Sequence, residues 1–153
     1  MARAQPGEPE PASEERGHLR RRGVRATAGN LPVLRDEVDE WARAGGLEDG
    51  IVESLALATY EAMANAVEHA YGGACGVLDV DAVLSGTGVE VAVTDHGTWR
   101  APDESDGQRR RGLPLVERLA DEAVVTTGEH GTRVQMRWST AEPRSDAAAP
   151  ADA

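Results

Sequence analysis

Apolar residues recur at helical spacing in two stretches of the first half of the chain. The first stretch covers residues 31–46, and its apolar positions lie three or four residues apart: Leu31, Leu34, Val38 and Trp41. This spacing predicts the buried face of an amphipathic helix. Asn30 is a favourable N-cap, and Gly45 and Gly46 follow the last apolar position, so we expect the helix to run between them.

The second stretch predicts a longer helix from about Glu48 to Ala70. Its apolar side consists of residues at the same spacing: Ile51, Leu55, Thr59, Ala62 and Ala66. The other side carries an acid, an amide and an imidazole at Glu61, Asn65 and His69. Four residues advance a helix by one turn plus roughly 40°, so these three form a slowly drifting polar stripe. By itself such a stripe is also typical of a solvated helix face.

Alternation of apolar and polar residues, typical of strands, appears in three further stretches: 18–27, 76–97 and 123–138. The second contains the turn Ser-Gly-Thr-Gly and the third a glycine-flanked turn, so each predicts an antiparallel hairpin. The first predicts an edge strand, and residues 113–123 predict a short helix. Helices followed by antiparallel hairpins predict an α+β two-layer sandwich, with one face of the sheet covered by helices.

The two ends of the chain lack a periodic apolar pattern. Residues 1–17 are rich in Pro, Glu and Ala, and residues 140–153 have a similar composition. Such segments cannot bury enough apolar surface to fold, so we expect both to be disordered. The folded domain is therefore expected to span residues 18–139.

Composition narrows the class of protein. The 153 residues are 40 % apolar and include no Phe, which predicts one domain with a core of small aliphatic side chains. A net charge of -11 argues against binding the phosphates of nucleic acids or an anionic membrane surface. Cys75 is the only cysteine, and no apolar run approaches the ~20 residues of a membrane span. These features are typical of a soluble cytoplasmic protein.

The sequence contains no Lys. This absence excludes a P-loop nucleotide site, in which a Lys contacts the phosphates, and it also excludes Schiff-base chemistry. A nucleotide site in this chain has to use other groups.

Two further features are of a kind that binds nucleotides. Asp95 ends an apolar strand, where its carboxylate could accept a hydrogen bond from an exocyclic amine, and Gly97 would allow a ligand to approach the backbone. Arginines at 109–111 precede Gly112, where a helix begins, and a helix N-terminus beside arginines attracts anions such as phosphate. Each feature alone is also typical of an ordinary strand exit or helix start.

Together these stretches resemble the sequence boxes of a known family. The segments EAMANAVEHAY, TDHGTW, RGLPLVERLAD and GTRVQMRW occur in the order and spacing of the N, G1, G2 and G3 boxes of the histidine-kinase-like (GHKL, Bergerat-fold) ATPases. Within that superfamily the chain looks most like the anti-sigma-factor serine/threonine kinases of the RsbW and SpoIIAB type. The resemblance extends from about Leu19 to Trp138, and it implies a Bergerat fold with a mixed, mostly antiparallel sheet.

The resemblance implies roles for individual residues. Glu61 matches the general base of the family, and Asn65 matches the amide whose oxygen ligates Mg²⁺. Asp95 matches the carboxylate that reads adenine, Gly97 its companion glycine, and Thr132 a hydroxyl near the adenine. The implied cofactors are ATP and Mg²⁺.

The lid over the phosphates departs from the family pattern. Gly112 and Leu113 match its end, but Arg110 stands where the usual Gly-x-Gly-Leu has its first glycine. Arg110 either clamps phosphate directly, or it marks a shortened lid with reduced activity. His69 matches a position usual in the subfamily, but neither it nor Cys75 is assigned any chemistry.

The implied function is that of a cytoplasmic kinase that holds a sigma factor inactive. It would phosphorylate a serine or threonine of a STAS-type antagonist, and the family commonly forms homodimers. One alternative is a non-catalytic module that binds ATP or sequesters its partner, which the Arg110 departure favours. The other is a detached ATPase domain of a two-component sensor kinase. This second alternative is disfavoured, since so short a chain shows no phosphoacceptor hairpin before the domain.

Overall fold

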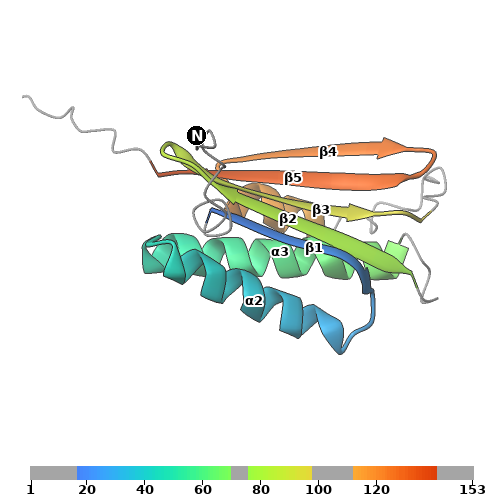
Figure 1. The fold of residues 1–153 in the computed structure, drawn as a ribbon. Coiled ribbons are helices and arrows are strands. Elements are labelled where there is room, and N and C mark those ends of the chain that lie inside the picture. The colour runs from blue at the N-terminus through green and yellow to red at the C-terminus, as the bar shows by residue number, and fades with distance from the viewer. Residues whose placement is uncertain (1–16, 70–75, 98–111, 141–153) are drawn as a thin grey trace, which may run out of the picture.

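A five-stranded sheet is the framework of the structure. The computed structural model describes residues 17–69, 76–97 and 112–140, and the strands lie in the order β1-β2-β3-β5-β4 (Figure 1). In chain order the elements are β1 (His18–Arg25), α2 (Asn30–Ala44), α3 (Asp49–His69), β2 (Val77–Leu84), β3 (Gly88–Asp95), α4 (Gly112–Leu119), β4 (Glu122–Gly128) and β5 (Gly131–Ser139). Each neighbouring pair of these strands is antiparallel.

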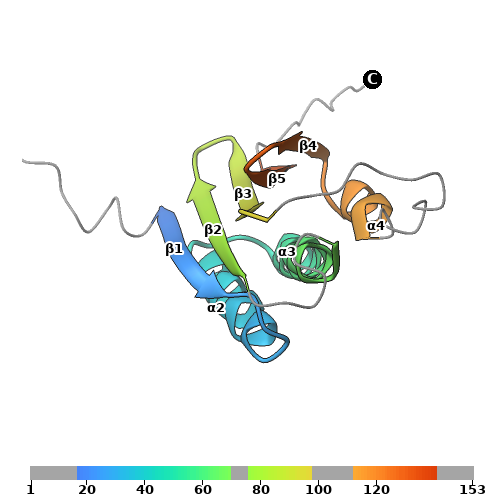
Figure 2. The same cartoon turned by 90° about the vertical axis from the view of Figure 1, so that its right-hand side faces the viewer.

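Helices α2, α3 and α4 lie on one side of the sheet, and among the described residues no helix covers the other side, which is called the open face (Figure 2). α3 packs against α2 on one flank and against α4 on the other. The predicted α+β two-layer sandwich is confirmed, and the two predicted hairpins are β2–β3 and β4–β5. Within the described parts of the chain, no helix is both long enough and apolar enough to cross a membrane.

The core between the sheet and the helices is built from aliphatic side chains. Alternate residues of the three central strands are buried, as a period of two requires: Leu78, Val80, Ala82, Val89, Val91, Val93, Val134, Met136 and Trp138. The helices add the apolar positions that their spacing predicted, with Leu34 and Val38 buried on α2 and Leu55 on α3. Small residues on α3, including Ala62 and Ala66, are buried as well. Burial of these apolar side chains therefore determines which face of each central strand packs against the helices.

The two ends of α2 differ in how well the sequence predicted them. Gly46 follows the helix with φ of 89°, the left-handed conformation that favours glycine, so the predicted C-terminal end is confirmed. The predicted N-cap is wrong, because Asn30 is the first helical residue and Gly29 precedes it with no side-chain cap bond. The hydroxyl of Thr27 instead accepts a hydrogen bond from the Asn30 N–H at 3.2 Å. A side chain in the turn after β1 therefore supplies the hydrogen-bond acceptor for the first N–H group of the helix.

α4 is shorter than predicted, because it ends at Leu119 and β4 already begins at Glu122. Two side chains donate hydrogen bonds to the carbonyl oxygen of its last residue, Leu119. Ser54 Oγ on α3 donates to the Leu119 carbonyl at 2.9 Å, and Trp138 Nε1 on β5 donates to the same oxygen at 2.8 Å. These bonds satisfy an acceptor that a helix end leaves without an intrahelical partner, and they tie α4 to both layers.

Candidate functional site

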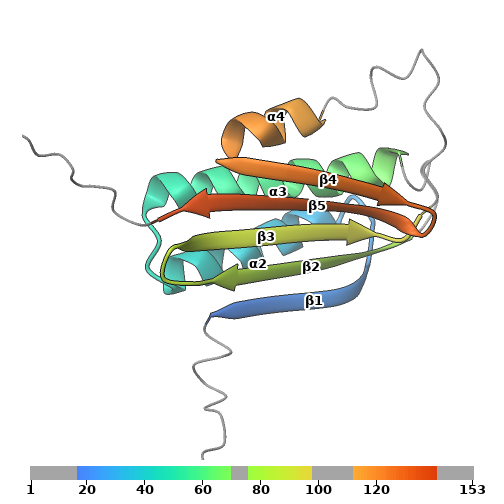
Figure 3. The same ribbon diagram turned by 90° about the horizontal axis from the view of Figure 1, so that it is seen from above.

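Four segments that are far apart in sequence are directed to one end of the sheet (Figure 3). The C-terminal half of α3, the end of β3 and the turn between β4 and β5 lie there, and the start of α4 points toward it. β3 and β5 are antiparallel neighbours, so the end of β3 meets the start of β5. This end therefore brings the segments that carry Asn65, Asp95 and Thr132 together.

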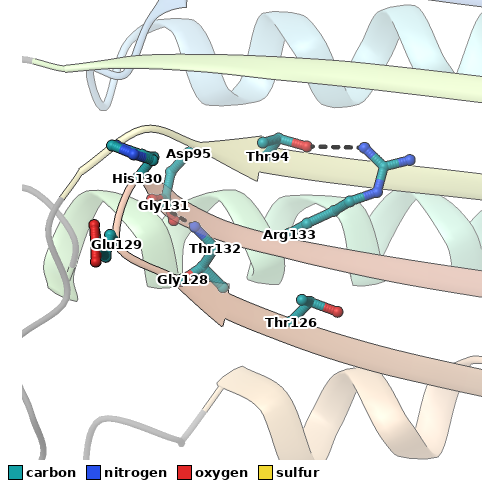
Figure 4. Close-up of a pocket in the computed structure, with 9 residues that line it drawn as sticks. All are labelled: Thr94, Asp95, Thr126, Gly128, Glu129, His130, Gly131, Thr132 and Arg133. Carbon is teal, nitrogen blue, oxygen red and sulfur yellow. Dashed lines mark hydrogen bonds between the residues drawn. The ribbon is translucent and has the colours of Figure 1, made fainter.

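Asp95 is a buried carboxylate at the end of β3. It is 3 % exposed and pairs with Thr132 in the ladder between β3 and β5. Its Oδ1 accepts a hydrogen bond from the Gly97 N–H at 3.1 Å. The same oxygen accepts a second bond from the Thr132 N–H at 3.2 Å (Figure 4). Two backbone donors from different segments thus hold this carboxylate in one orientation.

Gly131 makes the approach of the two strands possible. It adopts φ of 139°, and a Cβ built on it would lie 1.9 Å from the carbonyl oxygen of Asp95. No other residue type fits there without moving the backbone of β3. The sequence analysis treated this glycine only as part of a turn, because its contact with β3 depends on strand order.

An open hollow of about 310 Å³ lies at the turn between β4 and β5 (Figure 4). Asp95 and Thr132 line it together with Thr94 and Arg133, and Arg133 Nη1 donates to Thr94 Oγ1 at 3.2 Å. Thr94 and Asp95 are successive residues of one strand, so they face opposite sides of the sheet. The lining of the hollow thus includes residues of both faces, so the candidate site is defined by the buried Asp95 carboxylate.

Asn65 and Glu61 occupy neighbouring turns of α3. Asn65 is 6 % exposed, so it is not part of a solvated face. Its side-chain amide makes no hydrogen bond within the described residues. Glu61 is half-buried and lies one turn earlier on the same helix. An amide without a partner among the described residues has acceptor and donor capacity available for a ligand.

The remaining predicted residues lie in or beside the undescribed segments. Gly112 is the first residue of α4, and Leu113 is partly buried and packs against the core. Arg110 and Cys75 lie outside the described residues. His69 is the last residue of α3.

Asp79 on β2 was not singled out by the sequence, although it contacts the residue between Asp95 and Gly97. Nε2 of His96 lies 2.9 Å from its Oδ2, and the two residues are 17 positions apart in sequence. They meet only through the pairing of β2 with β3, so no local sequence signal marks them.

The electrostatic surroundings of Asp79 favour its ionised form. Burial opposes ionisation, but the Gly23 N–H, His96 and Arg22 together outweigh burial and lower the pKa of Asp79 from its ordinary value. Because the folded-state pKa is lowered, these contacts stabilise the fold above the ordinary carboxyl range of about 4, and the stabilisation is lost as the pH falls through the lowered pKa.

Comparison with known families identifies the class of protein. Residues 24–138 match the histidine kinase-like ATPase domain. Because this match covers most of the chain, the protein belongs to the histidine kinase-like ATPase family, and the resemblance predicted from the four sequence boxes is confirmed.

The chain is also similar to a solved structure of the RsbU and RsbW domains of Rv1364c from Mycobacterium tuberculosis. The sequence identity is 27 % and the TM-score is 0.65, and the match covers 81 % of this chain and 33 % of that chain. This chain therefore spans about a third of the length of the protein that it matches. The similarity agrees with the predicted RsbW-type subfamily and with the predicted fold.

Replacing Gly131 tests whether the hairpin must touch β3. Gly131→Ala should lower the free energy of unfolding by on the order of 1–3 kcal/mol, since the new Cβ would overlap the Asp95 backbone and the backbone conformation is strained for alanine. Denaturant-induced unfolding measures this loss. Gly128→Ala at the other end of the same turn is the control, because a Cβ there meets nothing within 4 Å. Equal midpoints for the two variants would show that the close approach does not constrain the fold.

Proposed function

We propose that this chain binds ATP with Mg²⁺ at the Asp95 end of the sheet and acts as an anti-sigma regulatory kinase. The observation that carries the proposal is the buried Asp95 carboxylate, which two backbone amides hold in one orientation. Membership of the histidine kinase-like ATPase family supports the nucleotide, and the similarity to the RsbU and RsbW domains supports the regulatory role.

Asp95 is suited to recognise adenine. A carboxylate accepts hydrogen bonds, and the exocyclic amine of adenine donates them, whereas guanine presents an acceptor oxygen at the corresponding position. Since the Gly97 and Thr132 amides hold Oδ1, the carboxylate is oriented before the base arrives. Gly97 and the Thr132 hydroxyl are the proposed neighbours of the base. We therefore expect the site to prefer ATP to GTP.

Asn65 fits the role of a Mg²⁺ ligand, because the residue is only 6 % exposed and its amide makes no hydrogen bond within the described residues. A single neutral amide binds Mg²⁺ weakly, so phosphate oxygens and water would complete the coordination shell. Bound Mg²⁺ would neutralise the charge of the phosphates during transfer.

Glu61 is the proposed general base. Its half-buried carboxylate lies on the same helix as Asn65 and one turn before it. In this role it accepts the proton from the hydroxyl that attacks the γ-phosphate. Gly112, Leu113 and Arg110 are proposed to act on the phosphates from the start of α4 and the segment before it.

The proposed partners are a sigma factor and a STAS-domain antagonist, whose serine or threonine receives the phosphate. The proposed location is the cytoplasm, with no direct contact to nucleic acid or membrane, and a net charge of -11 supports this part of the proposal. A homodimer is the proposed assembly. The proposed folded unit is 18–139, which includes the matched residues 24–138.

A second candidate function is a non-catalytic module that binds ATP or its partner without transferring phosphate. Arg110 favours it, because this residue replaces a glycine of the lid. Glycine permits positive φ and a close approach of backbone to phosphate, and arginine does not.

Asp95→Asn should weaken ATP binding by roughly ten- to a hundredfold while the protein stays folded. The Asn oxygen can keep the two backbone hydrogen bonds, but its amide then presents a donor to the donating adenine amine. Isothermal titration calorimetry measures the affinity, and Asp81→Asn on the open face is the control. Unchanged affinity in the folded Asp95 variant would remove Asp95 from the adenine role.

Glu61→Gln should bind ATP as the wild type does but lose phosphotransfer by about 10²–10⁴-fold, because Gln keeps the shape and cannot accept a proton. Transfer of labelled phosphate to a STAS protein encoded near this one provides the measurement. A variant that phosphorylates at the wild-type rate would place the base elsewhere.

Arg110→Gly separates the two interpretations of the lid. If Arg110 clamps phosphate, the substitution should weaken ATP by roughly ten- to a hundredfold and leave adenosine unchanged, because adenosine carries no phosphate. Parallel titrations with the two ligands measure this difference. Tighter ATP binding together with faster phosphotransfer would instead identify Arg110 as the loss of a lid glycine.

A further inference from the structure

Asp79 connects three segments beside the candidate site. Its Oδ1 accepts a hydrogen bond from the Gly23 N–H at 2.7 Å, and its Oδ2 lies 2.9 Å from Nε2 of His96. Nη1 of Arg22 lies 3.9 Å from the same Oδ2. Since the register of β1 shifts between Arg21 and Val24, Asp79 joins a bulge in β1, strand β2 and the residue that follows β3.

The strand register shows what the contact with His96 holds. Asp79 pairs with Thr94, and the ladder between β2 and β3 ends at the pair Leu78–Asp95. His96 lies one residue beyond this last pair, and its side chain reaches back across the open face to Asp79. The contact between Asp79 and His96 therefore holds the residue after β3 against β2, beyond the last backbone pair of the two strands.

His96 stands between two residues that touch each other in the candidate site. Asp95 precedes it, and Gly97 follows it and donates its N–H to Asp95 Oδ1 at 3.1 Å. A rotation of the backbone at His96 would separate this donor from its acceptor. The Asp79 side chain is 13 % exposed and that of His96 is 48 % exposed, so solvent screens the contact less than it screens a fully exposed pair.

We propose that Asp79 is a positioning residue of the nucleotide site. Through His96 it holds the turn that keeps the Gly97 amide on Asp95, and it thereby fixes the carboxylate that reads adenine. The proposal rests on the proposed function, because it takes Asp95 as the group that contacts the base.

Asp81 provides a matched control for this role. It lies two residues along the same strand on the same face, its side chain is 19 % exposed, and it contacts Arg20 at 3.2 Å and Arg22 at 3.5 Å. If Asp79 only stabilises the sheet, Asp79→Asn and Asp81→Asn should have the same consequences. If it positions the turn, only Asp79→Asn should affect the site.

The first measurement uses the full chain without nucleotide. Hydrogen exchange of the Gly97 amide, followed by NMR, should be about tenfold faster in Asp79→Asn and in His96→Gln than in the wild type, and unchanged in Asp81→Asn. The double variant should exchange no faster than either single variant, because both substitutions remove the same contact. His96→Gln leaves the bond between Asp79 and Gly23 in place, so it separates the turn from the β1 bulge.

The second measurement is the affinity for adenosine and for ATP. Asp79→Asn should weaken both by the same factor, about tenfold, because the base and not the phosphates is affected. Equal exchange of the Gly97 amide in the Asp79 and Asp81 variants, or wild-type adenosine affinity in Asp79→Asn, would overturn the proposal. A wild-type chain that binds neither ligand would overturn the proposed function instead, and the exchange of Gly97 would then decide alone whether Asp79 holds the turn.

Discussion

The burial of the Asp95 carboxylate is the constraint on which the rest of the candidate site depends. A carboxylate that is 3 % exposed has lost most of its water, and this loss is costly unless other hydrogen-bond donors take the place of water. Two of these donors are backbone N–H groups, one from the turn after β3 and one from the start of β5. The second is within reach only because Gly131 lets β5 approach the Asp95 backbone. Burial of the Asp95 carboxylate therefore requires both that β5 lies beside β3 and that position 131 is a glycine.

The strand order has a further consequence for the path of the chain. Because β5 lies between β3 and β4, the chain that leaves β3 must form α4 and β4 before it returns beside β3. α4 starts toward the Asp95 end, and β4 then runs back to that end (Figure 3). The bonds from Ser54 and Trp138 to the Leu119 carbonyl fix where α4 stops. The segment that resembles a phosphate lid is thus connected at both of its ends to elements directed at the same end of the sheet.

The elements were predictable from the sequence because each has a clear period, and the four boxes were predictable because their order matches a family. Contacts that depend on pairing were not. Asp79 and His96 are 17 positions apart and meet only through the register of β2 and β3. The N-cap of α2 was mispredicted, because the Asn30 side-chain amide donates to the Arg25 carbonyl at 2.9 Å, and the hydroxyl of Thr27 accepts the hydrogen bond from the Asn30 N–H. Local propensity is outweighed in this case by the turn that precedes the helix.

The distribution of charge in the chain limits which groups can bind the phosphates of a nucleotide. A net charge of -11 repels phosphates at long range, but at physiological ionic strength charges are screened beyond about 8 Å, so nearby groups determine binding. Asp95 and Glu61 are carboxylates on the helix-covered side of the sheet, and in the proposed function they serve the base and the attacking hydroxyl and would repel phosphate. Arginine has to supply the compensating side-chain charge, because the chain has no lysine, and residues 109–111 concentrate it directly before α4. The proposed site therefore assigns carboxylates to the base and the proton, and Mg²⁺ and arginine to the phosphates.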